Sequence, residues 1–200
     1  MTQEESGWEN YYQKTQGRTP RKVLLDTLDI IEKDRPRESR NAVDLGCGAG
    51  IETAILLEHG WDVLAIDSDP SGIKRLIDKV SDEHRPRLQT QVAKFEDVSL
   101  RETELVNASL SLPFCHPNHF PALWGKIVDA IQPGGRFAGH FFGVRDSWAN
   151  EPDMTFLTKE QVRALFENFV IESFHEMDED GSATSGPKHW HKFTVIARTM

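Results

Sequence analysis

Cysteine is scarce in this sequence, and long apolar runs are absent from it. Its 200 residues include 2 cysteines, Cys47 and Cys115, which lie far apart in the chain. No apolar stretch approaches the roughly 20 residues that a membrane helix requires, and the first residues are polar and acidic. Neither a membrane span nor a secretory signal is expected. In such a chain free thiols are more common than a disulfide, and we expect a cytoplasmic protein.

An excess of positive charge is also missing. The chain has 23 Lys and Arg residues against 32 Asp and Glu residues, which gives a net charge of −9. Non-specific nucleic-acid binding depends on clustered basic residues, so neither a nucleic-acid nor a membrane partner is expected. The length suits a single domain over residues 1–200, with the oligomeric state open between monomer and dimer.

What the sequence does contain is a glycine-rich loop at residues 41–50, which reads Asn-Ala-Val-Asp-Leu-Gly-Cys-Gly-Ala-Gly. A short apolar run leads into Asp44, alternate glycines follow, and a helical pattern begins at Ile51. This order predicts a strand, a loop and a helix. Glycines let a ligand lie against bare main chain, and the helix directs its free N–H groups toward the loop.

A second acidic residue supports a nucleoside ligand. The next apolar run, residues 63–66, ends at Asp67, about 20 residues beyond the glycines. A carboxylate at the end of the second parallel strand can accept both hydroxyls of a ribose. The loop reads D-x-G-x-G-x-G and not the G-x-G-x-x-G of dinucleotide-binding folds, so a nicotinamide oxidoreductase is disfavoured.

With these residues the sequence resembles the class I S-adenosylmethionine (SAM)-dependent methyltransferases, whose first motif is D/E-x-G-x-G-x-G. Within that class it is similar to the bacterial "methyltransferase domain" proteins near the tellurite-resistance and thiopurine-type enzymes. The segments that carry this closer resemblance are 107–114, 133–137, 145–148 and 188–191.

The element pattern agrees with that class. Strands alternate with helices along most of the chain, which predicts an α/β fold with a parallel sheet covered on both faces. The last two strands, expected at 170–177 and 190–197, have only an acidic turn between them, so they should form an antiparallel hairpin. The resemblance implies a Rossmann-like, seven-stranded sheet with the order 3-2-1-4-5-7-6.

The resemblance also implies a cofactor site for SAM, with S-adenosylhomocysteine as the product. The loop from Gly46 through Cys47 and Gly48 to Gly50 should hold the amino acid and ribose edge. Asp44 should serve the methionyl ammonium, or else it only orders the loop amides.

Asp67, with Ser68 beside it, should bind the ribose; the structural alternative for Asp67 is a helix N-cap. Phe95 and Glu96 replace the usual turn after the third strand and are expected at the adenine. Asn107 and Ala108 should line the methyl-donor side.

The N-terminal segment, residues 1–18, has two alternative interpretations. Tyr12 and Arg18, together with Trp8 and Tyr11, could fold over the cofactor as a lid. The alternative is a flexible terminus with one aromatic side chain docked in the core.

The acceptor site is expected beyond the carboxyl ends of the fourth and fifth strands. Its candidate residues are Phe114, His116, Phe142, Arg145 and Trp148. A general base, if the reaction needs one, could be any of five histidines, but no catalytic residue is assigned: His116, His119, His140, His189 and His191. The spacing of His116 and His119 fits a solvated loop better than a metal site, so no metal is expected.

The sequence therefore indicates an enzyme (EC 2.1.1.-) that transfers a methyl group from SAM to a small molecule. The alternative is a non-catalytic SAM-binding sensor or partner protein.

Overall fold

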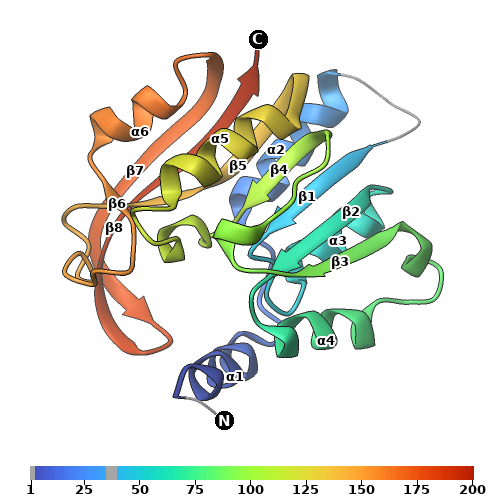
Figure 1. Cartoon of the computed structure of the whole chain (residues 1–200), viewed down its shortest axis with the longest axis horizontal. Coiled ribbons are helices and arrows are strands. Elements are labelled where there is room, and N and C mark those ends of the chain that lie inside the picture. The colour runs from blue at the N-terminus through green and yellow to red at the C-terminus, as the bar shows by residue number, and fades with distance from the viewer. Residues whose placement is uncertain (1–2, 35–39) are drawn as a thin grey trace.

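The computed structural model describes residues 3–34 and 40–200 (Figure 1). The surface loop expected at 33–40 lies mostly outside the described residues, and Lys33 and Asp34 close a helix. Among the described residues, no helix has the length and apolar character needed to cross a membrane. Both cysteines are free and buried.

A mixed sheet with the order β3-β2-β1-β4-β5-β8-β7 forms the centre of the fold, and the short strand β6 pairs with β5 outside this path. Strands β1 to β5 are parallel, and β8 runs antiparallel to both β5 and β7. The α/β fold and the C-terminal hairpin are confirmed. The strands are β1 Asn41–Leu45, β2 Asp62–Asp67, β3 Leu88–Val92, β4 Thr103–Ala108, β5 Ile131–Gly143, β6 Phe156–Leu157, β7 Phe169–Ala183 and β8 Gly186–Thr199.

The order differs from the predicted one through β6, which the sequence analysis missed. This strand has 2 residues, too few to show an alternating pattern. It makes an eighth strand and shifts the numbering of the last two. The seven longer strands lie in the expected spatial order.

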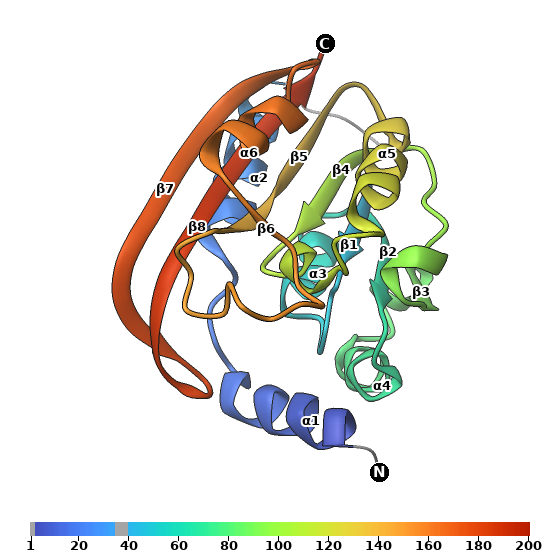
Figure 2. The same ribbon diagram turned by 60° about the vertical axis from the view of Figure 1, so that its left-hand side comes forward.

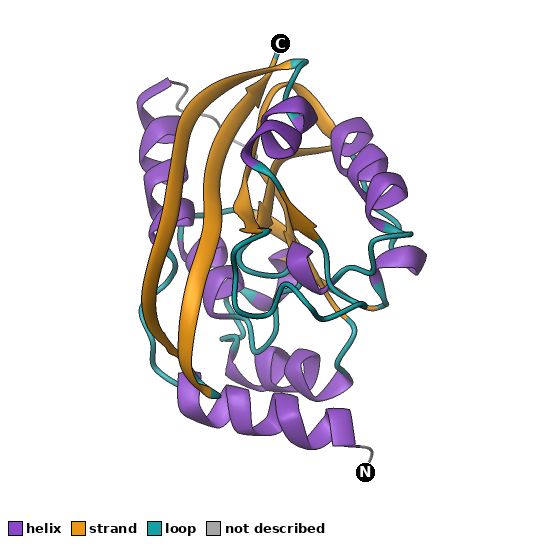
Figure 3. Cartoon of the chain, turned by 90° about the vertical axis from the view of Figure 1, so that its left-hand side faces the viewer, coloured by secondary structure: helices purple, strands orange, loops and turns teal. Residues whose placement is uncertain are grey.

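The predicted hairpin was too short. Its acidic turn, expected at 178–188, instead continues the ladder, and pairing extends to Ala183 opposite Gly186. Cross-strand charges stabilise this extension, because His189 contacts both Asp178 and Asp180. Figure 3 shows the two long strands running past the rest of the sheet.

Helices cover both faces of the sheet (Figure 1). One apolar cluster joins α5 and α6 to one face, and a second joins α2, α3 and α4 to the other. The helices are α1 Gln3–Thr15, α2 Lys22–Asp34, α3 Ile51–Glu58, α4 Pro70–Lys79, α5 Phe120–Ala130 and α6 Lys159–Leu165, with short 3-10 turns at Arg85–Arg87, Phe95–Asp97 and Leu112–Phe114.

Local signals located most of the helix ends. Asp69 caps α4 by accepting from the Ser71 N–H at 2.9 Å, and Thr158 forms the predicted capping box with Gln161. A Pro-Gly-Gly segment such as 133–135 predicts a helix stop, but α5 ends earlier, at Ala130, and the segment lies inside β5. The third strand ends at Val92, and Phe95 lies in the 3-10 turn that follows it.

Helix α1 was not predicted, because its sequence carries no clear start signal. Figure 2 shows it crossing the carboxyl-terminal end of the sheet, beside α4, with its last turn near the hairpin tip. There the Lys14 ammonium donates to the Thr184 carbonyl at 2.8 Å, and Glu9 pairs with Arg75 of α4. The N-terminal segment is therefore docked across the end of the sheet, where ligands bind in α/β folds.

Candidate functional site

The loop at residues 44–50, called here the cofactor loop, is held by its own main chain. The Gly46 and Cys47 N–H groups both donate to the Ile66 carbonyl, at 2.8 and 3.0 Å. Gly46 has a φ of +75°, and a Cβ there would lie 2.2 Å from the Cβ of Ser111. Ser111 in turn donates to the Leu45 carbonyl at 2.5 Å. No other residue fits at Gly46, because both its backbone angle and its surroundings exclude a side chain.

Asp67 lies at the end of β2 and faces this loop. Its carboxylate accepts from the Gly48 N–H at 2.7 Å and from the Asp69 N–H at 2.9 Å. Each oxygen keeps a second acceptor position. The helix-cap role weighed for Asp67 belongs to Asp69. Burial raises the pKa of Asp67, and a hydrogen-bond donor such as a ribose hydroxyl would stabilise its charged form.

Asp44 is buried beneath the cofactor loop. It accepts from the Thr53 hydroxyl at 2.6 Å and from the Asn107 amide at 2.7 Å. Burial, with the nearby charge of Glu52 second, raises the pKa of Asp44 to about 7. Asn107 also accepts from the Ser109 hydroxyl at 3.0 Å. These bonds tie the end of β1 to β4 and to α3. Neither of them goes to a main-chain amide of the loop, so both roles weighed for Asp44 stay predictions.

Glu52 is a buried acid that the sequence analysis missed. The Arg18 guanidinium donates to both of its oxygens at 2.7 Å, and the Arg21 N–H donates to it at 3.1 Å. The terminal nitrogens of Arg18 are thus occupied by Glu52, while its buried Nε has no partner among the described residues. An acid at the second position of a helix carries no distinctive spacing, although it suits the positive end of the helix dipole.

Tyr12 of α1 reaches the cofactor loop from outside. Its ring is 4 % exposed, and a Cβ on Gly48 would lie 3.2 Å from it. A Cβ on Gly72 of α4 would lie 2.6 Å from the Tyr12 hydroxyl oxygen. Tyr12 therefore packs between two glycines, where any larger side chain would crowd its ring or hydroxyl. This contact brings α1 to the cofactor loop.

The residues proposed for adenine lie on the 3-10 turn after β3. The Ala93 N–H donates to the Asp67 carbonyl at 3.0 Å, which places this turn beside Asp67. Phe95 packs partly into the apolar cluster under α5, and Lys126 binds the Glu96 carbonyl at 2.9 Å. Ser68 is exposed and Ala108 is buried at the end of β4. Their roles at a cofactor stay predictions.

A line of aromatic rings continues from α1 to the hairpin, and we call it the aromatic wall. The wall contains three of the five acceptor candidates, which are Phe114, Phe142 and Trp148. Two further tryptophans belong to it, Trp8 from α1 and Trp190 from β8. Centroid separations are 5.4 Å for Trp8–Phe114, 6.4 Å for Phe114–Trp148 and 6.1 Å for Phe142–Trp148. Trp190 lies 5.8 Å from Phe142 and 6.3 Å from Trp148. Through Trp190 the hairpin therefore reaches the acceptor candidates.

A buried ion pair supports the wall. Lys188 pairs with Asp146, and both side chains are almost fully buried. The Lys188 ammonium lies 3.6 Å from the Trp148 ring centroid, 4.7 Å from that of Trp190 and 5.1 Å from that of Phe142. Asp146 also accepts from the Trp148 N–H at 3.0 Å. Lys188 lies in the 188–191 segment that carried the resemblance, but only the fold shows its contact with Asp146.

Two acceptor candidates lie away from the wall. Arg145 is exposed and pairs with Glu176 and Asp178, on the face of the hairpin opposite Trp190. His116 lies 3.7 Å from Asp153 in a half-buried loop and accepts from the Asn118 N–H. Alternation places Trp190 and His191 on opposite faces of β8, and His191 packs under the backbone of Gly143.

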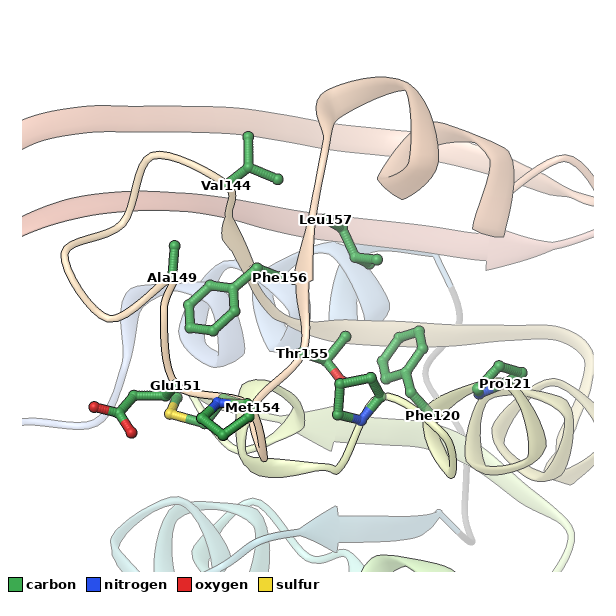
Figure 4. A pocket seen from close by; sticks show the side chains of 11 residues that line it. Phe120, Pro121, Val144, Ala149, Glu151, Met154, Thr155, Phe156 and Leu157 are labelled. Carbon is green, nitrogen blue, oxygen red and sulfur yellow. The ribbon is translucent and has the colours of Figure 1, made fainter.

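A separate cavity of about 510 Å³ opens between the start of α5 and the segment 144–157 (Figure 4). Its lining is mainly apolar and includes Phe120, Met154, Phe156 and Leu157, with Glu151 as the charged member. None of the five residues of the aromatic wall lines it. The cavity is therefore distinct from the surface that the wall forms.

The cofactor loop and its surroundings fit SAM on structural grounds. Gly46 and Gly48 expose main chain at the loop, and Asp67 keeps acceptor positions for ribose hydroxyls. Asp44 and Asp67 are acids at the loop, and acids favour a ligand that carries a positive sulfonium and an ammonium; the charge of Glu52 is matched by Arg18. The residues present are of the kind that the resemblance requires.

Comparison with known proteins agrees. The methyltransferase domain family matches residues 42–135. Curated relatives include carboxy-S-adenosyl-L-methionine synthase of Citrifermentans bemidjiense, 23% identical over 119 residues, and that of Vibrio parahaemolyticus, 27% identical over 121 residues. Each alignment covers 56% of this chain and 49% or 48% of the relative. The chain thus spans about half the length of the curated relatives it matches.

Solved structures share the fold. TehB from Haemophilus influenzae aligns with a TM-score of 0.75 at 15% identity, covering 96% of this chain and 67% of that one. The N-methyltransferase NodS from Bradyrhizobium japonicum, in complex with S-adenosylhomocysteine, aligns with a TM-score of 0.67 at 15% identity, covering 93% and 90%. At these identities the likeness extends to the fold alone.

Proposed function

We propose that this chain, which is a class I SAM-dependent methyltransferase, methylates a small molecule that has an apolar or aromatic part. The observation that supports this acceptor class is the aromatic wall. Within the wall, the rings of Phe114 and Trp148 lie next to each other. Phe114 is 39 % exposed, so part of this apolar surface is open to a ligand. Flat apolar surface beside a cofactor site favours a flat apolar ligand.

In this proposal the protein works mainly by binding and orientation. When bound, SAM supplies a methyl group whose bond to sulfur breaks as the bond to the acceptor forms, and the electron pair stays on sulfur. Asp67 would hold the ribose hydroxyls, and the cofactor loop would fix the amino acid end. The wall would exclude water and align the acceptor with the methyl group, and such positioning can supply most of the rate enhancement.

No side chain of the wall can take a proton from the acceptor. An acceptor that is already ionised needs no base, whereas a hydroxyl would require one. We therefore propose that the attacking group of the acceptor is already ionised when the acceptor enters the site. The cytoplasmic location and the role of residues 1–18 as a lid also stay proposals.

The acceptor is proposed from this chain's own side chains. The curated relatives are named for the synthesis of a carboxylated SAM, but they match over about half of their length. A purely SAM-binding role has less support, because a binder has no use for a partly exposed aromatic surface beside its cofactor loop.

A screen with labelled SAM against aromatic and aliphatic small molecules tests the proposal. We expect methylation of aromatic members, and Trp148→Ala should lower kcat/KM about 10- to 100-fold by removing apolar contact area. Affinity for S-adenosylhomocysteine should be unchanged. Leu25→Ala, at an exposed position of α2, is the control. Turnover that is indifferent to Trp148, or confined to aliphatic compounds, would contradict the proposed acceptor class.

A further inference from the structure

Three basic side chains converge beside the aromatic wall: Arg21, His140 and Lys192. On β5 and β8, His140 is opposite Thr194 and Phe142 is opposite Lys192. Residues opposite each other in an antiparallel pair share a face, and so do residues two apart. His140, Phe142, Trp190 and Lys192 therefore lie on one face of the sheet, and that face carries the wall.

Two contacts link these residues to elements that flank the cofactor loop. Arg21 is held just before α2 by its N–H bond to Glu52, in the first turn of the helix that follows the loop. His140 Nδ1 accepts from the Leu110 N–H at 3.3 Å, in the segment that follows β4. The positive charge of Arg21 contributes to lowering the pKa of both His140 and Lys192. His140 and Lys192 thus lie on the sheet face that carries the wall, and Arg21 and His140 contact elements that flank the cofactor loop.

Neither Arg21 nor Lys192 forms an ion pair with a carboxylate among the residues that the structure describes. The Nε of Arg21 is buried and lacks a hydrogen-bond partner there. Two other basic side chains of this region do have a carboxylate partner, since Arg18 pairs with Glu52 and Lys188 pairs with Asp146. Both Arg21 and Lys192 are half-buried, and two neighbouring cations without a paired carboxylate are costly there.

The pKa values reflect this crowding. Burial, followed by the charges of Lys192 and Arg21, lowers the pKa of His140 to about 3. Burial and the charge of Arg21 also lower the pKa of Lys192, against weaker opposition from Glu179 and Asp146. His140 is therefore neutral at physiological pH. With Nδ1 accepting from Leu110, its proton lies on Nε2, which makes it a donor and not a base.

We propose that Arg21 and Lys192 bind an anionic group of the methyl acceptor, such as a carboxylate, with His140 as a neutral hydrogen-bond donor. The aromatic part of the acceptor then lies on the wall. This inference rests on the proposed function and narrows its acceptor to aromatic or apolar anions. A cationic acceptor is excluded by repulsion from both basic side chains.

The same chemistry could come from a second source, the carboxylate of the SAM amino acid. The two sources predict different variants. If the pair binds the acceptor, Arg21→Gln leaves the affinity for S-adenosylhomocysteine unchanged. If it binds the cofactor, that affinity falls while the affinity for methylthioadenosine, which lacks the amino acid, stays constant. This second outcome would overturn the proposal.

The test measures binding without turnover, by calorimetry on the S-adenosylhomocysteine complex. Benzoate is the anionic probe and benzamide its neutral counterpart. We expect benzoate to bind at least about tenfold more tightly, and Arg21→Gln or Lys192→Met to remove most of that difference. Arg21→Lys and Lys192→Arg should restore part of it. Lys22→Gln, which changes the net charge equally at the exposed neighbouring position, should have no effect.

A second readout is the imidazole of His140, followed by NMR. Its pKa should rise when either cation is removed, and again when benzoate binds, because each change relieves repulsion of the charged imidazole. Equal affinity for benzoate and benzamide in the folded protein, with no shift at His140, would refute the anion site. Benzoate binding without methylation of any acceptor would instead leave the anion site standing and count against the proposed function.

Discussion

The cofactor region and the acceptor region lie side by side but are built in opposite ways. The acids of the cofactor region come from two short segments, 44–52 and 67–69, and they are held by main-chain, hydroxyl, amide and guanidinium groups. The acceptor region joins α1, the segments after β4 and β5, and the hairpin. Its side chains are aromatic rings and cations.

The opposite charges suit opposite ligands. In the proposed arrangement Asp44 and Asp67 would attract the sulfonium and ammonium of the cofactor, and Arg21 and Lys192 would attract an anionic acceptor. Each region would repel the partner of the other. Charge would then order the two ligands along the carboxyl end of the sheet, in addition to shape.

The largest effect should come from breaking the acceptor region at its buried ion pair. Lys188→Met leaves Asp146 buried without its cation, and we expect the free energy of unfolding to fall by about 3–5 kcal/mol. Denaturant titration measures the change. The double variant Lys188→Met with Asp146→Asn should recover much of the loss, because no uncompensated charge remains. A single variant as stable as the parent would mean that the pair does not hold the wall together.

A smaller effect is expected in the cofactor region. Asp67→Ala should lower the affinity for S-adenosylhomocysteine by about 2–3 kcal/mol, or about 30- to 150-fold, through loss of charge-assisted bonds to the ribose. Calorimetry measures it. Asp62→Ala, at the other end of β2, is the matched control. The assignment of Asp67 to the ribose cannot survive unchanged affinity in a folded variant.

The two regions also differ in how far the sequence predicted them. The glycine loop, Asp67 and the helix caps rely on residues close together in the chain, so spacing alone located them. Trp190, Lys188 and Arg21 depend on which strands become neighbours and how far the hairpin extends. The acidic composition of 178–188 indicated a turn, whereas cross-strand contacts keep it in the ladder.

The same distinction explains the positions of two acceptor candidates, whose roles stay predictions, and of the first helix. Arg145 is two residues past β5, within reach of the wall by sequence, but Glu176 and Asp178 hold it on the other face. His116 was selected for its place after β4 and is oriented by its own loop. Helix α1 was missed because its stability comes from docking on α4 and the hairpin, which its own sequence does not show.

A pH dependence should separate the regions further. The folded pKa of Asp44, about 7, lies above its ordinary value of 3.8, so the folded chain retains a proton that the unfolded chain releases between these values. This group therefore makes the free energy of unfolding fall as pH rises from about 4 to about 7. Asp44→Asn should remove that part of the fall, measured by denaturation across the range.

Cofactor binding should show the complementary trend. The ammonium of S-adenosylhomocysteine favours the ionised carboxylate, so the affinity for this ligand should rise about tenfold as Asp44 ionises, equivalent to about one pKa unit. Asp44→Asn should flatten this rise, while benzoate binding in the acceptor region keeps its own profile. A rise that persists in the variant would assign the titration to another group.

The smallest effect concerns the contact that joins α1 to the hairpin. Lys14 donates to the Thr184 carbonyl from an exposed position, so Lys14→Ala should change the free energy of unfolding by less than about 1 kcal/mol. Its consequence should be kinetic: with one tie removed, α1 leaves the end of the sheet more often, and S-adenosylhomocysteine dissociates a few-fold faster. Stopped-flow displacement measures this rate. Lys22→Ala, in an exposed pair within α2, should leave it unchanged.

Tyr12 remains between Gly48 and Gly72 in both variants, so a faster rate in Lys14→Ala alone would show that the hairpin helps to keep α1 over the cofactor. Equal rates would mean that α1 is held from the cofactor side only and that the two regions open independently.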